Sequence, residues 1–579
     1  MTKAPKSRGT AAPSTARRPA RRGGSPADRA RTSLPPATFA WLFFIALALR
    51  VAHLLAMRRS PYFAHPIIDA WTYHDAARSI VAGHGHPDAV FWQPPGYSYI
   101  LALLYAITGP ADFFAPRLVQ ALLGAAAAVL TAWIGARQFG PRVGLAAGLV
   151  VACHGTLIYF DGELLGVSFT VALQLIAVAL AIGAAGAARP GRFWFAAGFA
   201  AGVASLVTAP TLVFVAALAA FARRHAHLVI LAAALAIAPV TIRNAVKGGE
   251  AVLISTNAGI NLYLGNNPRY DETVQIRPDR HWTELTKEPF EHGILTKSGG
   301  SNYFARRVFK WAWEDPIGFL RLQLKKLRLL LGGDEIFRNQ AIYPSRQYSL
   351  VLSVLLWKVP GLAFPFGLLA PLGLLGFVVA WRRAPLLACL VVSYALATVA
   401  FFVAARYRVP LVPYLAIFAA EAVRWFVSAA PARKAAAAAG VTAVAAACNL
   451  GQGGMSARMN ADAEYSLAAQ LQTEGRAAEA MIHYKIALED RPGYSEAWVN
   501  LGVLEASRGN GAAAASAFEE GLRLDPKDVT AMIDLAALRE REHRWEEAIE
   551  LYQRAALLNP GDDAPVKRIA YLRGILSGR

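Results

Sequence analysis

The feature that most limits how this chain can fold is a series of long apolar runs within its first 450 residues. One of them, Ser168 to Ala187, has twenty residues without a charge, about the length that crosses a bilayer of ~30 Å. Only 17% of the 579 residues are charged, whereas soluble domains carry about 25%. Apolar runs lie at 38–57, 114–136, 143–160, 164–187, 193–208, 210–222, 227–243, 361–381, 384–404, 409–427 and 434–450. We therefore expect an all-α, polytopic transmembrane helical bundle with eleven spans.

The charges of the short connecting loops predict the orientation, because cytoplasmic loops are enriched in Lys and Arg. Basic pairs occur at Arg137/Arg142, Arg189/Arg192, Arg223/Arg224, Arg382/Arg383 and Arg433/Lys434. With these pairs and the N-terminus in the cytoplasm, the loops 58–112 and 244–347 and everything after 450 lie outside. The last run is short and only mildly apolar; if it does not cross, the C-terminal part is cytoplasmic. We expect residues 37–450 to form a multi-pass domain of the cytoplasmic (inner) membrane.

The net charge of +20 is partly concentrated at the N-terminus. Residues 1–36 hold nine Lys or Arg and a single acid, Asp28, among Pro, Ala, Ser and Gly. Such a segment cannot bury enough apolar surface to fold, so we expect a disordered basic cytoplasmic tail. No aromatic residue is interleaved with these charges, which argues against a nucleic-acid partner. The three Cys residues lie in apolar runs and show neither a disulfide framework nor metal-ligand spacing.

The C-terminal part has a period of 34 residues, which separates Pro492, Pro526 and Pro560. Small, aromatic and leucine positions recur in the same register: Ala480, Ala514 and Ala548; Tyr484, Phe518 and Tyr552; Leu467, Leu501 and Leu535. This combination is typical of tetratricopeptide repeats, in which paired helices touch at the small residue. We expect three repeats over 460–579 with a capping helix at 565–576. They bind a polypeptide partner or pack against the membrane domain.

The first outer loop holds the sharpest candidate for chemistry, Asp69, shortly after the first span. A carboxylate at the membrane surface can accept a proton from a hydroxyl that attacks a sugar carbon. The alternative is that Asp69 caps the predicted helix 70–81. Further residues of this loop are candidates to line the same site: Tyr73, His74, Asp75, Gln93 and Tyr97.

Arg406 and Arg408 flank Tyr407 at the outer end of the span 384–404. Two arginines on the outside depart from the charge bias of the other short loops. Guanidinium groups at the level of the lipid headgroups suit bidentate contact with a phosphate. The alternative is that these long basic side chains snorkel to the membrane surface.

Arg243, followed by Asn244, is also basic and outside at the end of a span, and Gly- and Asn-rich stretches that resemble plain turns come after it. Asp161 and Glu163 are outer acids beside the span 164–187. They either face the same site or mark a water-exposed hairpin.

Histidines and acids of the first loop form a loose cluster: His65, His74, His84 and His86 with Asp69, Asp75 and Asp88. Their spacing matches no zinc motif, and no phosphate-binding Walker loop or nucleophile elbow occurs in the sequence. The sequence therefore identifies no cofactor, and a divalent metal at this cluster stays open.

Three segments, taken in order, carry a resemblance to a known family. They read IIDAWTYHDAARSIVAGHG with QPPGYSYILALLYAITG, then APVTIRNAVKGGEAVLISTNAGINLYLGNNP, then ARYRVPLVPYLAIFAAE. Together they resemble the GT-C glycosyltransferases of the protein-mannosyltransferase and aminoarabinose-transferase superfamily, in particular bacterial members with C-terminal tetratricopeptide repeats. Two positions depart from many relatives: Ala70 stands where they have Glu after the first-loop Asp, and Ala209 stands where they have Arg or Lys.

The resemblance implies a sugar donor on a polyprenyl phosphate and catalysis on the outer face of the membrane. It implies that Asp69 is the general base and that Arg243, Arg406 and Arg408 bind the donor phosphate. The acceptor is then a hydroxyl of a protein, lipid or glycan, and the repeats lean toward a polypeptide. The rival readings are a transporter, which normally has ionisable groups near the bilayer midplane, and a non-catalytic scaffold that presents the repeats.

Overall fold

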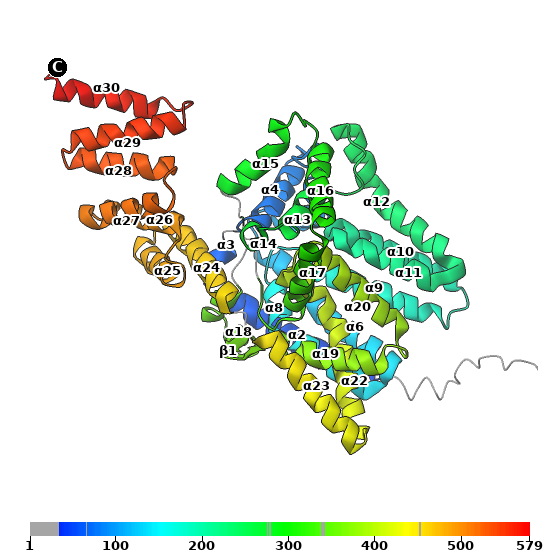
Figure 1. Ribbon diagram of the computed structural model, residues 1–579. Coiled ribbons are helices and arrows are strands. Elements are labelled where there is room, and N and C mark those ends of the chain that lie inside the picture. Colours follow the sequence, from blue (N-terminus) through cyan, green and yellow to red (C-terminus); the bar gives the residue numbers. More distant parts are fainter. Residues whose placement is uncertain are drawn as a thin grey trace, which may run out of the picture.

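The computed structural model describes residues 34–578, apart from 65, 275, 277–279, 337–341 and 451–452. The predicted basic tail up to residue 33 and His65 of the predicted cluster lie outside the described residues. The described regular structure is almost entirely helical, which confirms the predicted fold class. Figure 1 shows two parts, a large bundle and a stack of paired helices, joined through α24 (Gly453–Thr473).

The bundle is built from the apolar runs. Its helices are α2 (Pro36–Met57), α6 (Phe114–Phe139), α7 (Pro141–Ala152), α8 (Gly155–Asp161), α9 (Val167–Ala184), α10 (Pro190–Val207), η1 (Ala209–Thr211), α11 (Leu212–Ala222), η2 (Arg223–His225), α12 (Ala226–Gly248), α19 (Phe366–Ala380), α20 (Pro385–Ala400), η4 (Val409–Leu411), α22 (Val412–Ser428) and α23 (Pro431–Asn449). Every predicted run is thus helical over most of its length.

Five helical segments are long and apolar enough to cross a membrane: Pro36–Met57, Phe114–Phe139, Val167–Ala184, Ala209–Gly248 and Ala405–Ser428. The pair α7 and α8, bent by 56°, makes a sixth if it counts as one span. The predicted run 143–160 is therefore not one straight helix, because His154 has an extended backbone. The predicted run 361–381 begins later than expected, at Phe366. The other predicted membrane crossings, including the crossing by α23, stay predictions.

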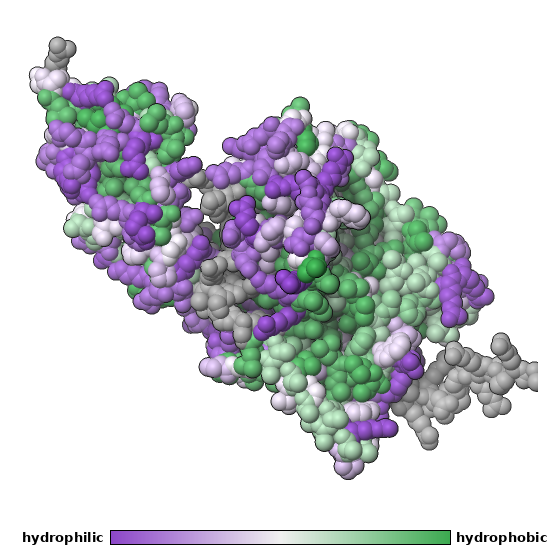
Figure 2. All heavy atoms as spheres, viewed as in Figure 1, coloured by the Kyte–Doolittle hydropathy of each residue, from purple (hydrophilic) through white to green (hydrophobic). Residues whose placement is uncertain are grey.

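Apolar side chains on the outside of the bundle agree with a lipid environment. Large apolar residues on different helices are more than half exposed, including Trp41, Phe44, Ile230, Val378 and Leu396. Water-soluble proteins rarely expose so much contiguous apolar surface. Figure 2 shows that hydrophobic side chains gather over the bundle, whereas the outer segments and the repeats are more hydrophilic. The chain is a multi-pass membrane protein.

The segments between the bundle helices form a layer at one end of the bundle. Its elements are α3 (Pro61–Ala64), α4 (Asp69–Val81), α5 (Gly96–Thr108), α13 (Ala258–Gly265), α14 (Tyr270–Thr273), α15 (Arg280–Glu291), α16 (Lys297–Glu314), α17 (Pro316–Leu331), η3 (Tyr343–Gln347), α18 (Leu350–Leu355), β1 (Trp357–Val359), β2 (Leu362–Phe364) and α21 (Ala405–Arg408). The strands pair antiparallel across Pro360-Gly361, where Gly361 has a φ of 81°. That conformation suits the Pro-Gly sequence of a type II turn.

A buried ion pair joins α2 to α8 inside the bundle. Arg50 donates from Nε to Asp161 over 2.7 Å, and the Ser168 hydroxyl donates to the same carboxylate over 2.5 Å. A Cβ at Gly124 would lie 2.0 Å from an Asp161 oxygen, so only glycine leaves room for the pair. Asp161 is 3% exposed and Glu163 is 6% exposed. The alternative of a water-exposed hairpin at these acids is therefore wrong.

The repeats occupy the C-terminal part, as predicted. Their helices are α24, α25 (Ala477–Asp490), α26 (Ser495–Ser507), α27 (Gly511–Leu524), α28 (Val529–Arg541) and α29 (Trp545–Leu558), closed by α30 (Ala564–Leu576). Ala480, Ala514 and Ala548 are completely buried, which explains the small residue in the repeat pattern. The first helix begins at Gly453, earlier than the predicted start at 460.

Candidate functional site

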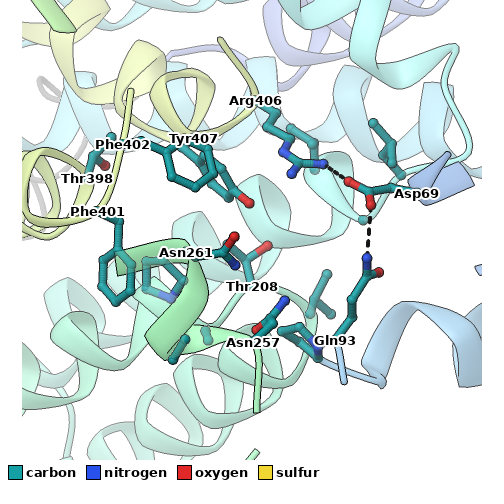
Figure 3. Close-up of a pocket in the computed structure, with 18 of the residues that line it drawn as sticks. Asp69, Gln93, Thr208, Asn257, Asn261, Thr398, Phe401, Phe402, Arg406 and Tyr407 are labelled. Atoms are coloured by element: carbon teal, nitrogen blue, oxygen red, sulfur yellow. Dashed lines mark hydrogen bonds and ion pairs between the residues drawn. The ribbon is translucent and has the colours of Figure 1, made fainter. Parts of the chain in front are cut away.

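A cavity of about 420 Å³ lies between the layer of connecting segments and the ends of the bundle helices. It is bounded by the start of α4, the Trp92–Pro94 turn, the break before α9, η1, the start of α13, the end of α20 and α21. Segments from four distant parts of the sequence thus meet at one place (Figure 3). Of the predicted site residues, Asp69, Tyr73, Gln93, Arg406 and Tyr407 line this cavity.

Asp69 and Arg406 form the charged centre of the cavity, although 337 residues separate them in the sequence. One carboxylate oxygen of Asp69 accepts a bond from the Arg406 guanidinium, and the other accepts from Gln93 Nε2 over 2.9 Å (Figure 3). The N-cap of α4 is Ile68, and Asp69 is the first helical residue. The alternative that Asp69 serves as a helix cap is therefore wrong.

The side chain of Arg406 packs against aromatic rings, and one of its N–H donors has no hydrogen-bond partner among the described residues. Its guanidinium lies 4.8 Å from the centre of the Tyr407 ring, and Tyr407 packs edge-on against Phe402 at 5.5 Å. Arg406 Nε is buried without a hydrogen-bond partner among the described residues. Because the side chain is enclosed by protein, with 19% of it exposed, the snorkelling alternative is wrong for Arg406.

Tyr73 closes the cavity beneath Asp69, one helical turn along α4. Its ring packs edge-on against Tyr97 at 5.2 Å. Burial raises the pKa of Tyr73, the neighbouring Asp69 carboxylate raises this pKa further, and Arg406 acts in the opposite direction. The phenol is therefore a neutral hydroxyl at physiological pH.

Arg408 is not among the described residues that line the cavity. It is buried beneath the motif, where Nη2 donates to Glu335 over 2.6 Å and to the Asp334 carbonyl over 3.0 Å. Its guanidinium also lies 3.8 Å from the Phe366 ring centre. Arg408 thus joins α21 to the end of the loop 244–347, and snorkelling is wrong here as well.

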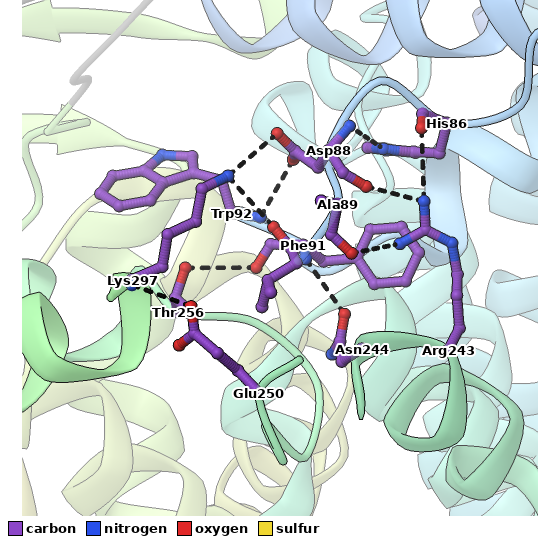
Figure 4. Close-up of polar contacts among 11 residues, drawn as sticks. His86, Asp88, Ala89, Phe91, Trp92, Arg243, Asn244, Glu250, Thr256 and Lys297 are labelled. Carbon is purple, nitrogen blue, oxygen red and sulfur yellow. Dashed lines mark hydrogen bonds and ion pairs between the residues drawn. The ribbon is translucent and has the colours of Figure 1, made fainter. Parts of the chain in front are cut away.

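Arg243 and Asn244 also lie apart from the described lining, and they hold the first outer loop in place (Figure 4). Arg243 donates to the carbonyl oxygens of His86, Asp88 and Ala89. Asn244 accepts from the Phe91 N–H over 3.1 Å and donates to the carbonyls of Val252 and Ile254. These bonds hold in place the segment from His86 to Phe91, which leads to Gln93.

Lys297 and Asp88 hold the same loop from the side opposite Arg243 (Figure 4). Lys297 Nζ lies 3.6 Å from Asp88 and donates to the Val90 carbonyl over 3.3 Å. Asp88 in turn accepts from the Trp92 N–H over 3.0 Å. The backbone before Gln93 is therefore fixed by charged groups from α12 and α16.

The remaining predicted residues have structural partners outside the cavity. His74 pairs with the Tyr105 hydroxyl at 2.9 Å, and Tyr97 donates to Gln120 over 2.6 Å. Asp75 is exposed on α4, and Asp161 and Glu163 are buried in the bundle. Over the described ranges, His, Cys, Asp and Glu side chains form no group of three or more suited to a metal ion.

Lys326 supports the cavity wall from behind. This fully buried lysine donates to the carbonyls of Gly265 and Phe401 and, over 2.6 Å, to Asn266 Oδ1. Asn266 also donates to the Ala400 carbonyl over 2.8 Å. Burial lowers the pKa of Lys326 to about 7. These bonds secure the end of α20, from which Phe401 and Phe402 face the cavity.

A comparison with known protein families finds one whose matched region includes part of this cavity. Residues 92–242 match the family described as dolichyl-phosphate-mannose-protein mannosyltransferase. The matched region includes three lining segments, at Gln93, Leu165–Val167 and Val207–Val213. This part of the membrane domain is thus similar to a glycosyltransferase family. Residues 465–528 and 505–570 match tetratricopeptide repeat families, so the membrane domain is followed by a tetratricopeptide-repeat domain.

Solved structures show more distant likenesses. The archaeal oligosaccharyltransferase AglB from Archaeoglobus fulgidus, solved with an inhibitory peptide and a dolichol-phosphate, is 14% identical with a TM-score of 0.39, over 70% of this chain and 54% of that chain. ArnT from Cupriavidus metallidurans, bound to undecaprenyl phosphate, is 14% identical with a TM-score of 0.38, over 89% and 80%. The first TPR of Spaghetti, bound to an HSP90 peptide, is 18% identical with a TM-score of 0.20, over 21% and 95%. The chain spans about half the length of the archaeal enzyme, and no curated protein matches it.

Several residues that line the cavity of the membrane domain escape prediction from the sequence. Asn257 and Asn261 lie four residues apart, one helical turn, and face the same space as Thr208 (Figure 3). Their Asn- and Gly-rich segment resembles a plain turn, although the spacing at the start of a helix is a usable signal. Ala209, a position where the resemblance leads one to expect Arg or Lys, also lines the cavity. Arg406 is therefore the one arginine among the described lining residues.

Proposed function

We propose that this protein transfers a sugar from a polyprenyl-phosphate donor to a hydroxyl acceptor on a protein, lipid or glycan. The observation that carries the proposal is the pairing of Asp69 with Arg406 in the wall of the cavity. A carboxylate and a guanidinium side by side supply the two groups that such a displacement needs. The site would lie at the outer face of the cytoplasmic membrane, where the donor lipid can reach it from the bilayer.

In the proposed reaction, the acceptor oxygen attacks the anomeric carbon while Asp69 takes the hydroxyl proton. A new C–O bond forms as the bond to the phosphate oxygen breaks, and the phosphate leaves with the electron pair. The attack from the opposite side inverts the anomeric centre. Gln93 holds Asp69 through its hydrogen bond, and Tyr73 lines the same cavity one turn further along α4, so the carboxylate stays directed into the cavity.

Arg406 would stabilise the negative charge that grows on the departing phosphate. Such preorganised charge is usually the largest single contribution to catalysis. Among the described residues, Nε of Arg406 has no hydrogen-bond partner. This supports the role, because a phosphate oxygen would satisfy that donor. When the guanidinium turns to the phosphate, its hold on Asp69 weakens, and the carboxylate becomes free to accept the proton.

The end of α23 supports a location of the repeats on the same side as the cavity. Arg328 of α17 donates to the Leu450 carbonyl over 2.7 Å, and the Gly333 N–H donates to the Cys448 carbonyl over 3.1 Å. Both donors belong to the loop 244–347, which also contributes to the cavity. A polypeptide acceptor or partner bound by the repeats would then be near Asp69.

The test is to incubate the purified protein with polyprenyl-phosphate sugars and to measure the released polyprenyl phosphate. We expect release by the wild type and a loss of about 10²–10⁴-fold in Asp69→Asn, the usual contribution of a general base. Asp75→Asn is the matched control, because Asp75 is an exposed acid on the same helix. Release at the wild-type rate by Asp69→Asn would refute the assignment, and no release by the wild type with any donor would favour a transporter or a scaffold.

A further inference from the structure

The first repeat is joined to the membrane domain by a shared apolar core. Tyr62 of α3 is buried together with residues of α24 and α25, among them Leu467 and Tyr484. Ile67 packs against the same cluster from the segment that follows α3. Figure 1 shows α24 beside α3, at the foot of the stack of repeats. The repeats are therefore docked onto the first outer loop.

Charged residues of the first repeat also lie near a second segment of the membrane domain. Tyr348, just before α18, is close enough to the first repeat for Arg476 and Glu479 to act on it electrostatically. Burial is the main cause that raises the pKa of Tyr348, and Arg476 acts against it. The first repeat thus packs on the segment of Tyr62 and Ile67 and lies near the segment of Tyr348, which favours a fixed position over a loose tether.

The docked segment leads directly to Asp69. Ile68, between the docked Ile67 and Asp69, has a φ of 51° and a ψ of −113°. A β-branched residue in this conformation is strained, and such strain persists only where the surrounding structure enforces it. The dock holds one side of Ile68. On its other side, α4 begins with the Thr72 N–H donating to the Ile68 carbonyl over 3.0 Å.

The bundle holds α3 from the opposite face. Arg117 of α6 donates to the Phe63 carbonyl over 2.8 Å, and its guanidinium lies 4.1 Å from the Phe63 ring centre. Two neighbouring residues of α3 thus contact different domains: Tyr62 packs in the apolar cluster of the first repeat, and Phe63 contacts the bundle. The segment that leads to Asp69 is therefore held from both faces of α3.

We infer that the first tetratricopeptide repeat is a positioning element of the catalytic site, which holds Asp69 opposite Arg406 through Tyr62, Ile67 and the strained Ile68. This inference rests on the proposed function of Asp69. Tyr62 and Ile67 are positioning residues, since they act through Asp69 and do not line the cavity within the described chain. The dock also requires the repeats to face the same side of the membrane as Asp69.

The first test measures kcat and the KM for the lipid donor in full-length Tyr62→Ala and Ile67→Ala. A carboxylate displaced by about 1 Å costs up to ~10²-fold in rate. We therefore expect kcat to fall by about tenfold or more, with the donor KM unchanged. Tyr62→Phe and Ile67→Val keep the packing and should restore most of kcat. Leu572→Ala is the matched control, since Leu572 is completely buried in the last repeat cluster, far along the stack from the dock.

Unchanged kcat in Tyr62→Ala and Ile67→Ala, with Asp69→Asn inactive, would overturn this inference and leave the proposed function intact. An equal loss in Leu572→Ala would also overturn it, because general weakening of the repeats would then explain the effect. Wild-type activity in Asp69→Asn would instead overturn the proposed function itself.

The second test is sidedness, using a membrane-impermeant thiol reagent on intact cells. Single cysteines introduced as Asp75→Cys and Ser507→Cys, both at exposed positions, should react alike. Reaction of Asp75→Cys in intact cells, with Ser507→Cys protected until the membrane is opened, would overturn the dock.

Discussion

Arg406 and Arg408 stand two residues apart in one motif, yet the fold uses them for different purposes. Arg406 faces the cavity and pairs with Asp69, and both side chains keep some exposure, 19% and 14%. Arg408 is buried beneath the cavity and pairs with Glu335, where the side chains are 2% and 1% exposed. In a helical turn, positions two apart differ by about 200° around the axis, so the two guanidinium groups leave α21 in nearly opposite directions.

The difference teaches that charge and location in a sequence do not by themselves identify a binding group. A partly exposed pair next to open space can exchange its partners, which chemistry requires. A fully buried pair is costly to break and has no room for a substrate. The two arginines should therefore fail in different ways when they are removed.

The largest effect is expected for Arg406→Ala. It should lower kcat by about 10²–10³-fold, because the leaving phosphate loses its charged donor, while the amount of folded protein stays the same. Arg406→Lys should recover only part of the rate, since an ammonium cannot make the planar bidentate contact. Release of polyprenyl phosphate per mole of folded protein measures both. A fully active Arg406→Ala would remove the contrast with Arg408.

A second effect of similar size is expected for Arg408→Ala, and on stability instead of turnover. The change leaves Glu335 buried without its cation, which typically costs about 3–5 kcal/mol. Thermal unfolding in detergent should show a large drop in Tm, whereas the surviving folded protein keeps its kcat. The double variant Arg408→Met with Glu335→Gln should recover much of the Tm, because no unpaired charge remains. A stable but inactive Arg408→Ala would instead make Arg408 a site residue.

The smallest effect concerns Lys326, another buried cation, whose hydrogen-bond partners in the described chain are carbonyl and amide oxygens instead of a carboxylate. Burial lowers its pKa to about 7, whereas an unfolded lysine titrates near pH ~10.4. Between these values the unfolded chain binds more protons than the folded one, so this residue makes stability rise with pH, by at most about 1.4 kcal/mol per unit.

Lys326→Met should remove that rise. Measured at pH 6.5 and 9, the Tm of the wild type should increase relative to the Tm of the variant. Parallel changes in the two proteins would mean that Lys326 keeps its proton over this range and that the three acceptor oxygens outweigh burial.

Much of the fold follows from local patterns. The 34-residue period predicts the repeats and the buried Ala480, and the apolar runs predict the bundle helices, because each pattern reflects a face that must be buried. The candidate site is predicted in part: Asp69, Gln93 and Arg406 belong to motifs that do converge. The roles of Arg243 and Arg408 could not be predicted, since they depend on which loop carbonyls and which carboxylate the tertiary fold brings within reach.

The Arg50–Asp161 pair has a consequence for how the protein is made. Each charge alone would cost about 2.5–3.5 kcal/mol at the centre of an inserted helix, and together they are held inside the bundle at 2.7 Å. The helix α2 leaves the ribosome more than a hundred residues before α8, so Arg50 must wait in the membrane, or at its insertion machinery, until Asp161 arrives. Gly124 of α6 shapes the gap that receives them both. We therefore expect α2, α6 and α8 to pack together only after α8 has been inserted, because the Arg50–Asp161 pair cannot form before then.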